Sequence, residues 1–287
     1  MKISGTTRIL GIFGDPVKHS LSPLMHNEAL ARIGFDAVYV PFHVLPEHLP
    51  QAVASIRILD LLGVNLTVPH KERVCPLLDV VDSQARLIGA VNTVVNRDGC
   101  LTGYNTDGSG FLRSLAEDLG FDPAGRRILL LGAGGACRAA LVALAQAGAG
   151  SIVVANRTPE RATALVAEFG PIFSGTSFAS CSLAREALTA HLPGVDLLVN
   201  TSALGLGGES LADFPWKKLP SGAAVYDMVY GFEPTPLLRA AAAHGHGGAD
   251  GLGMLAAQGE EGFRLWIGQA PPSGVMKAQL LAAVAAR

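Results

Sequence analysis

The sequence predicts an α/β protein of two domains. Short apolar runs typical of strands alternate along most of the chain with longer segments of helical periodicity. In the middle, a strand-like run leads directly into a glycine-rich turn and an alanine-rich helix. The chain has 287 residues, which exceeds the usual size of a single domain. The alternation predicts sheets that are mostly parallel and covered by helices on both faces.

Composition and charge narrow the class of ligand. The formal net charge is -2, and 49% of the residues are hydrophobic. This balance gives no indication of a nucleic-acid or membrane-surface partner, so a small molecule is the expected ligand. No apolar run is long enough to span a bilayer, and residues 1–6 lack the apolar core of a signal sequence. We therefore expect a cytoplasmic protein.

The cysteines and histidines predict neither a disulfide framework nor a metal site. Cys75, Cys100, Cys137 and Cys181 are widely scattered and form no CxxC pair. The sequence His244-Gly245-His246 has no third ligand nearby, so we expect a solvated loop there and no metal cofactor.

The first elements are a strand at 8–13 and a helix at 22–33. Ser22 followed by Pro23 is a good pair for the N-cap and first helical positions. Ser20 and Ser22 beside a helix N-terminus also suit a carboxylate, because free N–H groups there favour anions. Capping and anion binding compete for the Ser22 hydroxyl, so Ser20 is expected to be the freer of the two.

Residues 63–71 (GVNLTVPHK) are where we place the chemistry. The apolar–polar alternation of 64–68 predicts a strand with one buried face, which Pro69 ends. Asn65, Thr67 and Lys71 would then offer an amide, a hydroxyl and an ammonium to a small polyhydroxylated ligand. Taken alone, these residues are better explained as an ordinary strand end followed by a surface lysine, so the case for a site depends on the other motifs.

The remaining elements of the first half fit the same alternation. Asp98-Gly99 between two strand-like runs predicts a β-hairpin. Asn92 and Asp107 are polar residues at element ends, and a simple helix N-cap is the alternative for Asp107. The other expected elements are a strand at 37–40, helices at 49–58, 83–88 and 110–119, and the hairpin strands at 89–96 and 100–104.

The second half begins with a dinucleotide-binding fingerprint. A strand at 128–131 leads into the turn 132–137 (GAGGAC) and a helix at 138–147, the order that this fingerprint requires. Glycines there allow a tight turn and the close approach of the backbone to a pyrophosphate. Cys137 takes the third small position, where glycine or alanine is usual.

The end of the next strand, 151–155, indicates which dinucleotide is bound. An NAD-binding unit usually carries an acidic residue there, which binds the ribose 2′-hydroxyl. This chain has Asn156-Arg157-Thr158 instead. A guanidinium and a hydroxyl suit the 2′-phosphate of NADP. We therefore expect NADP as the cofactor.

The rest of the chain continues the α/β pattern. Phe263, Trp266 and Ile267 lie at helical spacing and are expected in the core. Loops at the carboxyl ends of parallel strands, such as the polar turn from Thr201, are where a nicotinamide would lie. The expected elements are a helix at 159–169, strands at 196–200 and 223–227, a helix at 236–244, and a last helix from about residue 273.

Taken together, these segments resemble the shikimate dehydrogenase family over nearly the whole chain. The matching motifs are residues 14–16, 19–23, 26–27, 63–71, 89–93, 103–108, 132–136, 156–158, 200–202, 226–230 and 250–255, with Gln258. The resemblance implies the reversible NADPH-dependent reduction of 3-dehydroshikimate to shikimate, in the route to chorismate and the aromatic amino acids.

The resemblance also implies roles for individual residues. Lys71 and Asp107 would form the catalytic couple. Ser20 and Ser22, with Tyr230 nearby, would hold the substrate carboxylate. The ring hydroxyls would be bound by Asn65, Thr67, Asn92, Asp107 and Gln258, together with Lys71. The cofactor would be held by Gly132, Ala133, Gly134, Gly135 and Ala136 at the pyrophosphate, by Asn156, Arg157 and Thr158 at the adenosine phosphate, and by Thr201, Met228 and Gly251 towards the nicotinamide.

In this family architecture, residues 1–104 with 250–287 would form the substrate-binding domain. Residues 105–249 would form a Rossmann-type NADP-binding domain, and the C-terminal helices would return to the first domain. A homodimer is left open. One local departure is 245–249 (GHGGA), where the family usually has a short apolar strand, so we expect a frayed or irregular sheet edge.

Two other readings of the chain remain. A quinate/shikimate or aminoshikimate dehydrogenase is the alternative within the same class. A catalytically idle NADP-binding module is the alternative from another class, and the presence of both Lys71 and Asp107 argues against it.

Overall fold

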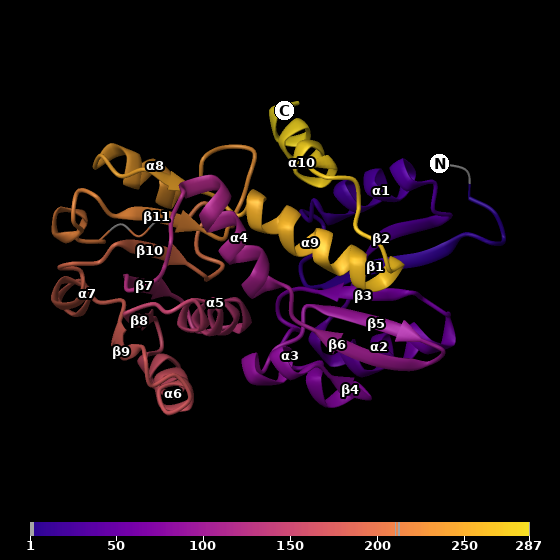
Figure 1. Ribbon diagram of the computed structural model, residues 1–287, viewed down its shortest axis with the longest axis horizontal. Coiled ribbons are helices and arrows are strands. Elements are labelled where there is room, and N and C mark those ends of the chain that lie inside the picture. Colours follow the sequence, from indigo (N-terminus) through magenta and orange to yellow (C-terminus); the bar gives the residue numbers. More distant parts are fainter. Residues whose placement is uncertain (1–2, 210, 212, 287) are drawn as a thin grey trace. The chain divides into compact units, whose positions relative to one another are not determined.

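The computed structural model describes residues 3–209, 211 and 213–286, and the chain folds as two compact units. The first unit extends to Gly110 and resumes at Leu255–Ala286, and the second is Phe111–Met254. Each unit contains a six-stranded sheet (Figure 1). The predicted α/β class, with C-terminal helices returning to the first unit, is confirmed. Among the described residues, no helix has the length and apolar character needed to cross a membrane.

The sheet of the first unit is mixed. β1 pairs in parallel with β2 and β3, whereas β5 is antiparallel to both β3 and β6, as the predicted Asp98-Gly99 hairpin requires. The strands are, in sheet order, β2 (Ala37–His43), β1 (Arg8–Gly14), β3 (Gly63–Leu66), β5 (Thr93–Arg97), β6 (Cys100–Tyr104) and β4 (Val80–Val81).

The helices of the first unit cover this sheet. In Figure 1, α1 and α10 lie side by side, and α1 also packs on β2. Trp266, from the C-terminal half of α9, donates its indole N–H to the Val94 carbonyl at 2.9 Å. The helices are α1 (Ser22–Ile33), α2 (Leu49–Ile58), α3 (Ser83–Ile88) and α10 (Val275–Ala285), with short 3-10 turns at Pro46–His48 and Cys75–Leu77.

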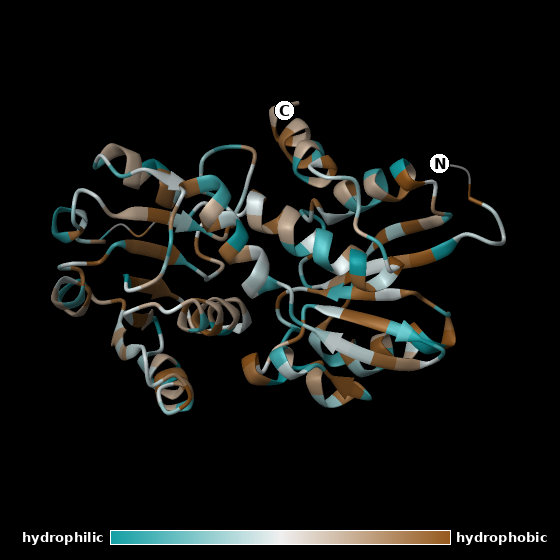
Figure 2. Ribbon diagram, in the orientation of Figure 1, coloured by the Kyte–Doolittle hydropathy of each residue, from teal (hydrophilic) through white to brown (hydrophobic). Residues whose placement is uncertain are grey.

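β3 differs from its prediction. The strand ends at Leu66, and all four of its residues are buried, so the expected strand at 64–68 with one buried face is wrong. β3 is an internal strand between β1 and β5, and the burial of all four of its residues means that both of its faces are covered. Val64 and Leu66 lie in an apolar core with Val94. Figure 2 shows brown, hydrophobic stretches in several strands of both units.

The sheet of the second unit is entirely parallel. Numbered along the chain within this unit, its order is 3-2-1-4-5-6, that of a dinucleotide-binding sheet. The switch point lies between β7 and β10. The strands are, in sheet order, β9 (Ser177–Ser182), β8 (Ser151–Asn156), β7 (Arg127–Leu131), β10 (Leu197–Asn200), β11 (Ala224–Asp227) and β12 (Gly248–Ala249).

Helices also flank the second sheet. α6 packs on β8 and β9, and α8 packs on β11 and β12. The helices are α5 (Gly135–Gln146), α6 (Pro159–Phe169), α7 (Arg185–His191) and α8 (Pro236–Ala243), with a 3-10 turn at Trp216–Lys218. Two further helices, α4 (Asp107–Leu119) and α9 (Leu252–Ile267), each contain a boundary between the units.

The sheet edge at 245–249 is more ordered than expected. Gly248 and Ala249 form the short strand β12, which pairs in parallel with β11, so the predicted frayed edge is wrong. A Cβ at Gly248 would lie 2.6 Å from Leu238 Cδ2 and 2.7 Å from the Val225 carbonyl oxygen, so only glycine fits. His246 is only 6% exposed and its Nδ1 lies 3.2 Å from the Ala223 carbonyl oxygen. The predicted solvated loop is therefore wrong for His246, whereas His244 is exposed.

Candidate active site

A partly buried ion pair lies at the centre of the first unit's polar cluster. Lys71 Nζ is 2.7 Å from Asp107 Oδ2. The other carboxylate oxygen of Asp107 accepts a hydrogen bond from Asn92 Nδ2 at 2.8 Å. Both oxygens of Asp107 are thus engaged by side chains from outside its helix, so the simple N-cap alternative does not describe this residue. The predicted catalytic couple is in direct contact.

The turn that carries Lys71 is held from two sides. The Lys71 carbonyl accepts the Val91 N–H at 2.8 Å. Next to it, His70 is fully buried, and its Nε2 lies 2.8 Å from the Val44 carbonyl oxygen. Because a carbonyl only accepts, Nε2 carries the proton. Burial lowers the pKa of His70, which favours this neutral form. The backbone of Lys71 is therefore fixed before any ligand binds.

Three of the predicted substrate-binding side chains join this cluster. Asn65 Nδ2 donates to the Asn92 carbonyl at 3.1 Å. Gln258, from α9, accepts from Asn92 Nδ2 at 3.3 Å and donates to the Leu255 carbonyl. All three side chains are at least 90% buried. The structure thus brings Asn65, Lys71, Asn92, Asp107 and Gln258 into one hydrogen-bonded group.

Thr67 and the two serines lie outside that group. Thr67 follows β3, and its methyl group occupies the space that a Cβ at Gly14 would need. The N-cap of α1 is Leu21 and no side chain caps the helix, so the predicted capping by Ser22 is wrong. Instead, the Ser22 N–H donates to Ser20 Oγ at 3.3 Å. Because the Ser22 hydroxyl does not cap the helix, capping gives no reason to regard the Ser20 hydroxyl as the freer of the two.

The glycine-rich turn of the second unit lies at the switch point of the sheet. Gly132 has φ +115°, and a Cβ there would lie 2.8 Å from Thr201 Oγ1. Thr201 in turn donates to the Leu131 carbonyl at 2.9 Å. Gly134 is the N-cap of α5 without a side-chain cap, and Gly135 begins the helix. The N–H groups of this first turn suit a pyrophosphate, and no Cβ obstructs their approach at Gly134.

The predicted 2′-phosphate residues follow the neighbouring strand. Asn156 ends β8 and donates to the Thr158 carbonyl at 2.9 Å. Thr158 is the N-cap of α6 and makes no side-chain cap bond. Arg157 between them is exposed. The donor set therefore fits a phosphate group, since a guanidinium and an uncapped helix N-terminus both favour anions.

Met228 and Gly251 are close neighbours at the end of β11. The Met228 N–H donates to the Asn200 carbonyl at 2.9 Å, and a Cβ at Gly251 would overlap the Met228 carbonyl. The buried Asp227 accepts from Asn200, Val229 and Thr235, which fixes the start of this loop. Burial raises the pKa of Asp227, although these three hydrogen bonds act in the opposite direction and lower it. Tyr230 follows in the same loop and is partly buried.

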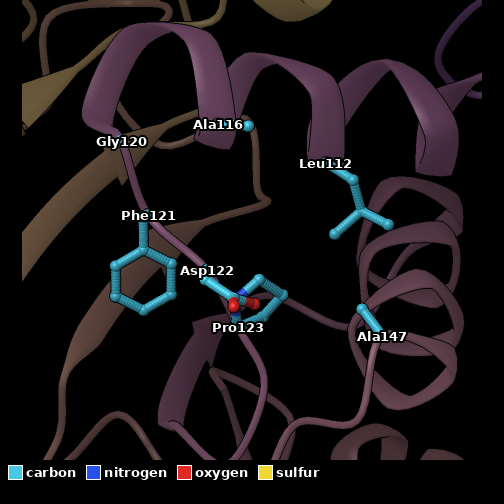
Figure 3. A pocket seen from close by; sticks show the side chains of 7 residues that line it. All are labelled: Leu112, Ala116, Gly120, Phe121, Asp122, Pro123 and Ala147. Atoms are coloured by element: carbon cyan, nitrogen blue, oxygen red, sulfur yellow. The ribbon is translucent and has the colours of Figure 1, made fainter.

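Other features of the second unit contain none of the predicted site residues. Figure 3 shows a mainly apolar pocket of about 340 Å³ beside the C-terminal end of α5, whereas the glycine-rich turn is at the N-terminal end of that helix. It is lined by Leu112, Ala116, Gly120, Phe121, Asp122, Pro123 and Ala147.

Within the part of the chain that the structure describes, no three His, Cys, Asp or Glu side chains are grouped to hold a metal.

Sequence reasoning missed several members of the buried cluster. Tyr39 donates to Asn65, Thr93 donates to Asn92, and Thr106 bonds Asn92 through both its N–H and its hydroxyl. Asn105 accepts the Asp107 N–H. Thr93, Asn105 and Thr106 lie inside motifs that the sequence analysis singled out. The sequence offered one indication of this role, namely that Thr93 opens β5 directly before two apolar residues.

These features define the class of the protein. A parallel sheet with a glycine-rich turn at its switch point, together with a buried Lys–Asp pair among carboxamides, characterises a dinucleotide-dependent oxidoreductase. Three family models match the chain: the shikimate dehydrogenase substrate binding domain at 12–94, shikimate/quinate 5-dehydrogenase at 114–202, and the shikimate 5'-dehydrogenase C-terminal domain at 251–281. The chain belongs to the shikimate dehydrogenase family, which confirms the resemblance.

Individual relatives cover the whole chain. The shikimate dehydrogenase (NADP(+)) of Geobacter metallireducens is 51% identical over 284 residues, 99% of both chains. The crystal structure of shikimate 5-dehydrogenase from Thermus thermophilus, in complex with NADP(H) and shikimate, is 40% identical with a TM-score of 0.82, covering 96% of this chain and 100% of that one. Quinate dehydrogenase from Corynebacterium glutamicum, in complex with NAD, is 31% identical with a TM-score of 0.85, covering 96% and 99%.

Proposed function

We propose that this protein is an NADP-dependent shikimate dehydrogenase, which reversibly reduces 3-dehydroshikimate to shikimate. It is an oxidoreductase acting on a CH–OH group, and its place is in the synthesis of chorismate and the aromatic amino acids. The observation that carries the proposal is the 2.7 Å contact between Lys71 and Asp107 inside a group of buried amides. The full-length relatives named shikimate dehydrogenase (NADP(+)) support it.

Lys71 handles the proton of the reaction. Bound NADPH supplies the hydride that reduces the ketone. The resulting alkoxide must gain a proton, and the Lys71 ammonium donates it; in the reverse direction, Lys71 accepts it. Asp107 orients Lys71 through their 2.7 Å contact and is itself oriented by Asn92. This arrangement places one charged donor where the negative charge develops.

The substrate is held at both ends in this proposal. Its carboxylate is bound by Ser20, Ser22 and Tyr230. Its ring hydroxyls are bound by Asn65, Thr67, Lys71, Asn92, Asp107 and Gln258. Five of these residues form one hydrogen-bonded group, and four of the five are buried, which supports a rigid and specific site.

The cofactor is held by the second unit in this proposal. The backbone of Gly132, Ala133, Gly134, Gly135 and Ala136 holds the pyrophosphate, and Asn156, Arg157 and Thr158 hold the 2′-phosphate. Thr201, Met228 and Gly251 lie beside the nicotinamide. We assign substrate binding to the first unit and NADP binding to the second, whose bounds differ by five or six residues from the expected division into 1–104 with 250–287 and 105–249. A cytoplasmic location and a homodimer are further parts of the proposal, and light scattering on the purified protein tests the dimer.

Initial-rate measurements test the function. We expect rapid reduction of NADP with shikimate, and much slower reaction with NAD or with quinate. A large preference for NAD, or for quinate over shikimate, would assign the chain to the quinate branch of the family instead. Purified protein that binds NADPH but never oxidises it with 3-dehydroshikimate would overturn the enzymatic proposal altogether.

A further inference from the structure

A buried chain of hydrogen bonds leads to the Lys71–Asp107 pair and includes two residues, Tyr39 and Thr93, that do not belong to the proposed site. Tyr39 Oη lies 2.6 Å from Asn65 Oδ1, and Asn65 Nδ2 lies 3.0 Å from Thr93 Oγ1. Thr93 Oγ1 lies 3.0 Å from Asn92 Oδ1, and Asn92 Nδ2 lies 2.8 Å from Asp107 Oδ1. All five residues belong to the first unit.

A backbone carbonyl fixes the orientation of the Asn65 amide. The Asn92 carbonyl oxygen lies 3.1 Å from one end of that amide, and a carbonyl oxygen only accepts. This end must therefore be the NH2 group, whose second proton points to Thr93 Oγ1. The other end is the oxygen, which accepts from the Tyr39 hydroxyl. Asn65 thus uses both of its N–H groups inside the protein.

A backbone N–H fixes the orientation of the Asn92 amide in the same way. The Thr106 N–H points to one end of this amide at 2.9 Å, and an N–H only donates. That end must be Oδ1, so Nδ2 faces the Asp107 carboxylate. A reversed amide would place its oxygen against the carboxylate oxygen, and it would leave the Thr106 N–H without its acceptor.

Thr93 stands between these two amides, and both of its roles are therefore determined. Its oxygen accepts from Asn65 Nδ2, and its proton is donated to Asn92 Oδ1. We propose that Thr93 is a positioning residue whose hydroxyl locks both carboxamides, so that Asn92 keeps donating to Asp107. The inference rests on the function proposed above. Only a group that accepts and donates at one atom serves here, and Thr93 is fully buried, so water does not replace it.

Thr93→Val tests this role because it removes the hydroxyl and keeps the branched shape. We expect kcat with shikimate to fall by roughly 10-fold and the KM for shikimate to rise by about as much, with the KM for NADP unchanged. Thr93→Ser keeps the hydroxyl and is expected to restore both parameters to within about 3-fold. Thr102→Val makes the same substitution in β6 of the same sheet and is the matched control.

Two further measurements separate positioning from simple loss of stability. In protein labelled with 15N-asparagine, Thr93→Val is expected to shift the side-chain NH2 signals of both Asn65 and Asn92, whereas Thr102→Val leaves them in place. In an Asn92→Ala background, Thr93→Val is expected to lower kcat by less than about 2-fold more, because Thr93 acts through Asn92.

Clear results overturn the inference. Unchanged NH2 signals in Thr93→Val would do so, as would a full additional loss of kcat in the Asn92→Ala background. A Thr93→Ser variant as impaired as Thr93→Val would also contradict it, since the hydroxyl would then not be the group that matters. These outcomes are distinct from a failure of the proposed function, which is decided by the activity of the unaltered protein with NADP or NAD and with shikimate or quinate.

Discussion

At the scale of single residues, the site depends on a few atoms held in fixed directions. Lys71 and Asp107 touch through one nitrogen and one oxygen, the other carboxylate oxygen of Asp107 accepts from Asn92, and the Asp107 N–H donates to Asn105. Sequence reasoning found this pair because both residues lie in recognisable motifs. It did not find Thr93 or Tyr39, because their roles come from contacts between residues up to 28 positions apart.

Removing the Lys71 ammonium should impair the chemistry more than binding. We expect Lys71→Ala to lower kcat by roughly 10²–10⁴-fold with a smaller change in the KM for shikimate, because the proton donor is lost while most binding groups remain. Steady-state kinetics in both directions check this. Near-normal turnover of the variant would remove Lys71 from the mechanism.

His26 makes the stability of the first unit depend on pH. Its ring stacks on Tyr39 at 4.4 Å and has Trp266 on another side, and burial lowers its pKa to about 3. In the folded state it stays neutral, whereas in the unfolded state it binds a proton below about pH 6.5. The folded state therefore loses stability as the pH falls from about 6.5 towards 3.

A variant isolates this contribution. Between pH 7.5 and 5.5, we expect the free energy of unfolding to fall by about 1.4 kcal/mol more in the unaltered protein than in His26→Phe. Urea unfolding at the two pH values gives both numbers. Equal pH dependence in the two proteins would mean that His26 is not held neutral in the folded state.

At the scale of elements, the glycine-rich turn shows how the sheet order creates a site. β7 and β10 are neighbours at the switch point, so the turn after β7 meets the polar turn after β10, and Gly132 lies directly against Thr201. This contact was not predictable from the spacing of the glycines. It depends on which strand lies beside β7, and the sequence reveals strand order only through the fingerprint as a whole.

Two alanine substitutions distinguish the glycines of this turn. Gly132→Ala should lower the free energy of unfolding by about 1–3 kcal/mol without any ligand, because φ is +115° and the new methyl group meets Thr201. Gly134 has φ -105° and open space where a Cβ would lie, so Gly134→Ala should leave the free energy of unfolding unchanged. Thermal or urea unfolding of the two variants, each compared with the unaltered protein, measures both changes in stability. Equal losses would contradict the steric account.

Prediction of elements succeeded where periodicity was strong and failed where it was weak. The helices Leu49–Ile58 and Pro159–Phe169 were predicted with their observed ends, since each has a proline near its start and a clear apolar face. β9 and α7 were missed. β9 reads SFASCS, whose small and polar residues show no alternation, and α7 has only seven residues. The burial of β3 depends on its neighbours, which the local pattern does not contain.

At the scale of the whole molecule, the polar cluster and the glycine-rich turn belong to different compact units. Lys71, Asp107 and Gln258 belong to the first unit, although Gln258 is about 150 residues further along the chain. The turn at Gly132 belongs to the second. The family resemblance anticipated the return of the C-terminal helices. No local pattern could have placed Gln258 beside Asn92.

Hydrogen exchange can assign each ligand to a unit. At 100 times its Kd, shikimate alone should slow exchange about 100-fold at residues 63–71 and 89–107, whereas NADP alone should do so at 131–138 and 156–158. Mass spectrometry of peptides from each unit measures this. Lys71→Ala, which leaves the second unit unaltered, should retain the protection by NADP. Protection of 131–138 by shikimate with none at 63–71 would reverse the assignment.

The orientation of Asn65 has a consequence for inhibitor chemistry. Because both of its N–H groups are committed to Asn92 and Thr93, this amide can meet a ligand only through a lone pair on its oxygen. A hydroxyl or amine on the ligand satisfies that lone pair. A fluorine or a ketone oxygen in the same place sets two acceptors against each other. Compounds built for this wall of the site should therefore carry donors, and swapping one polar atom for another of equal size will not be a neutral change.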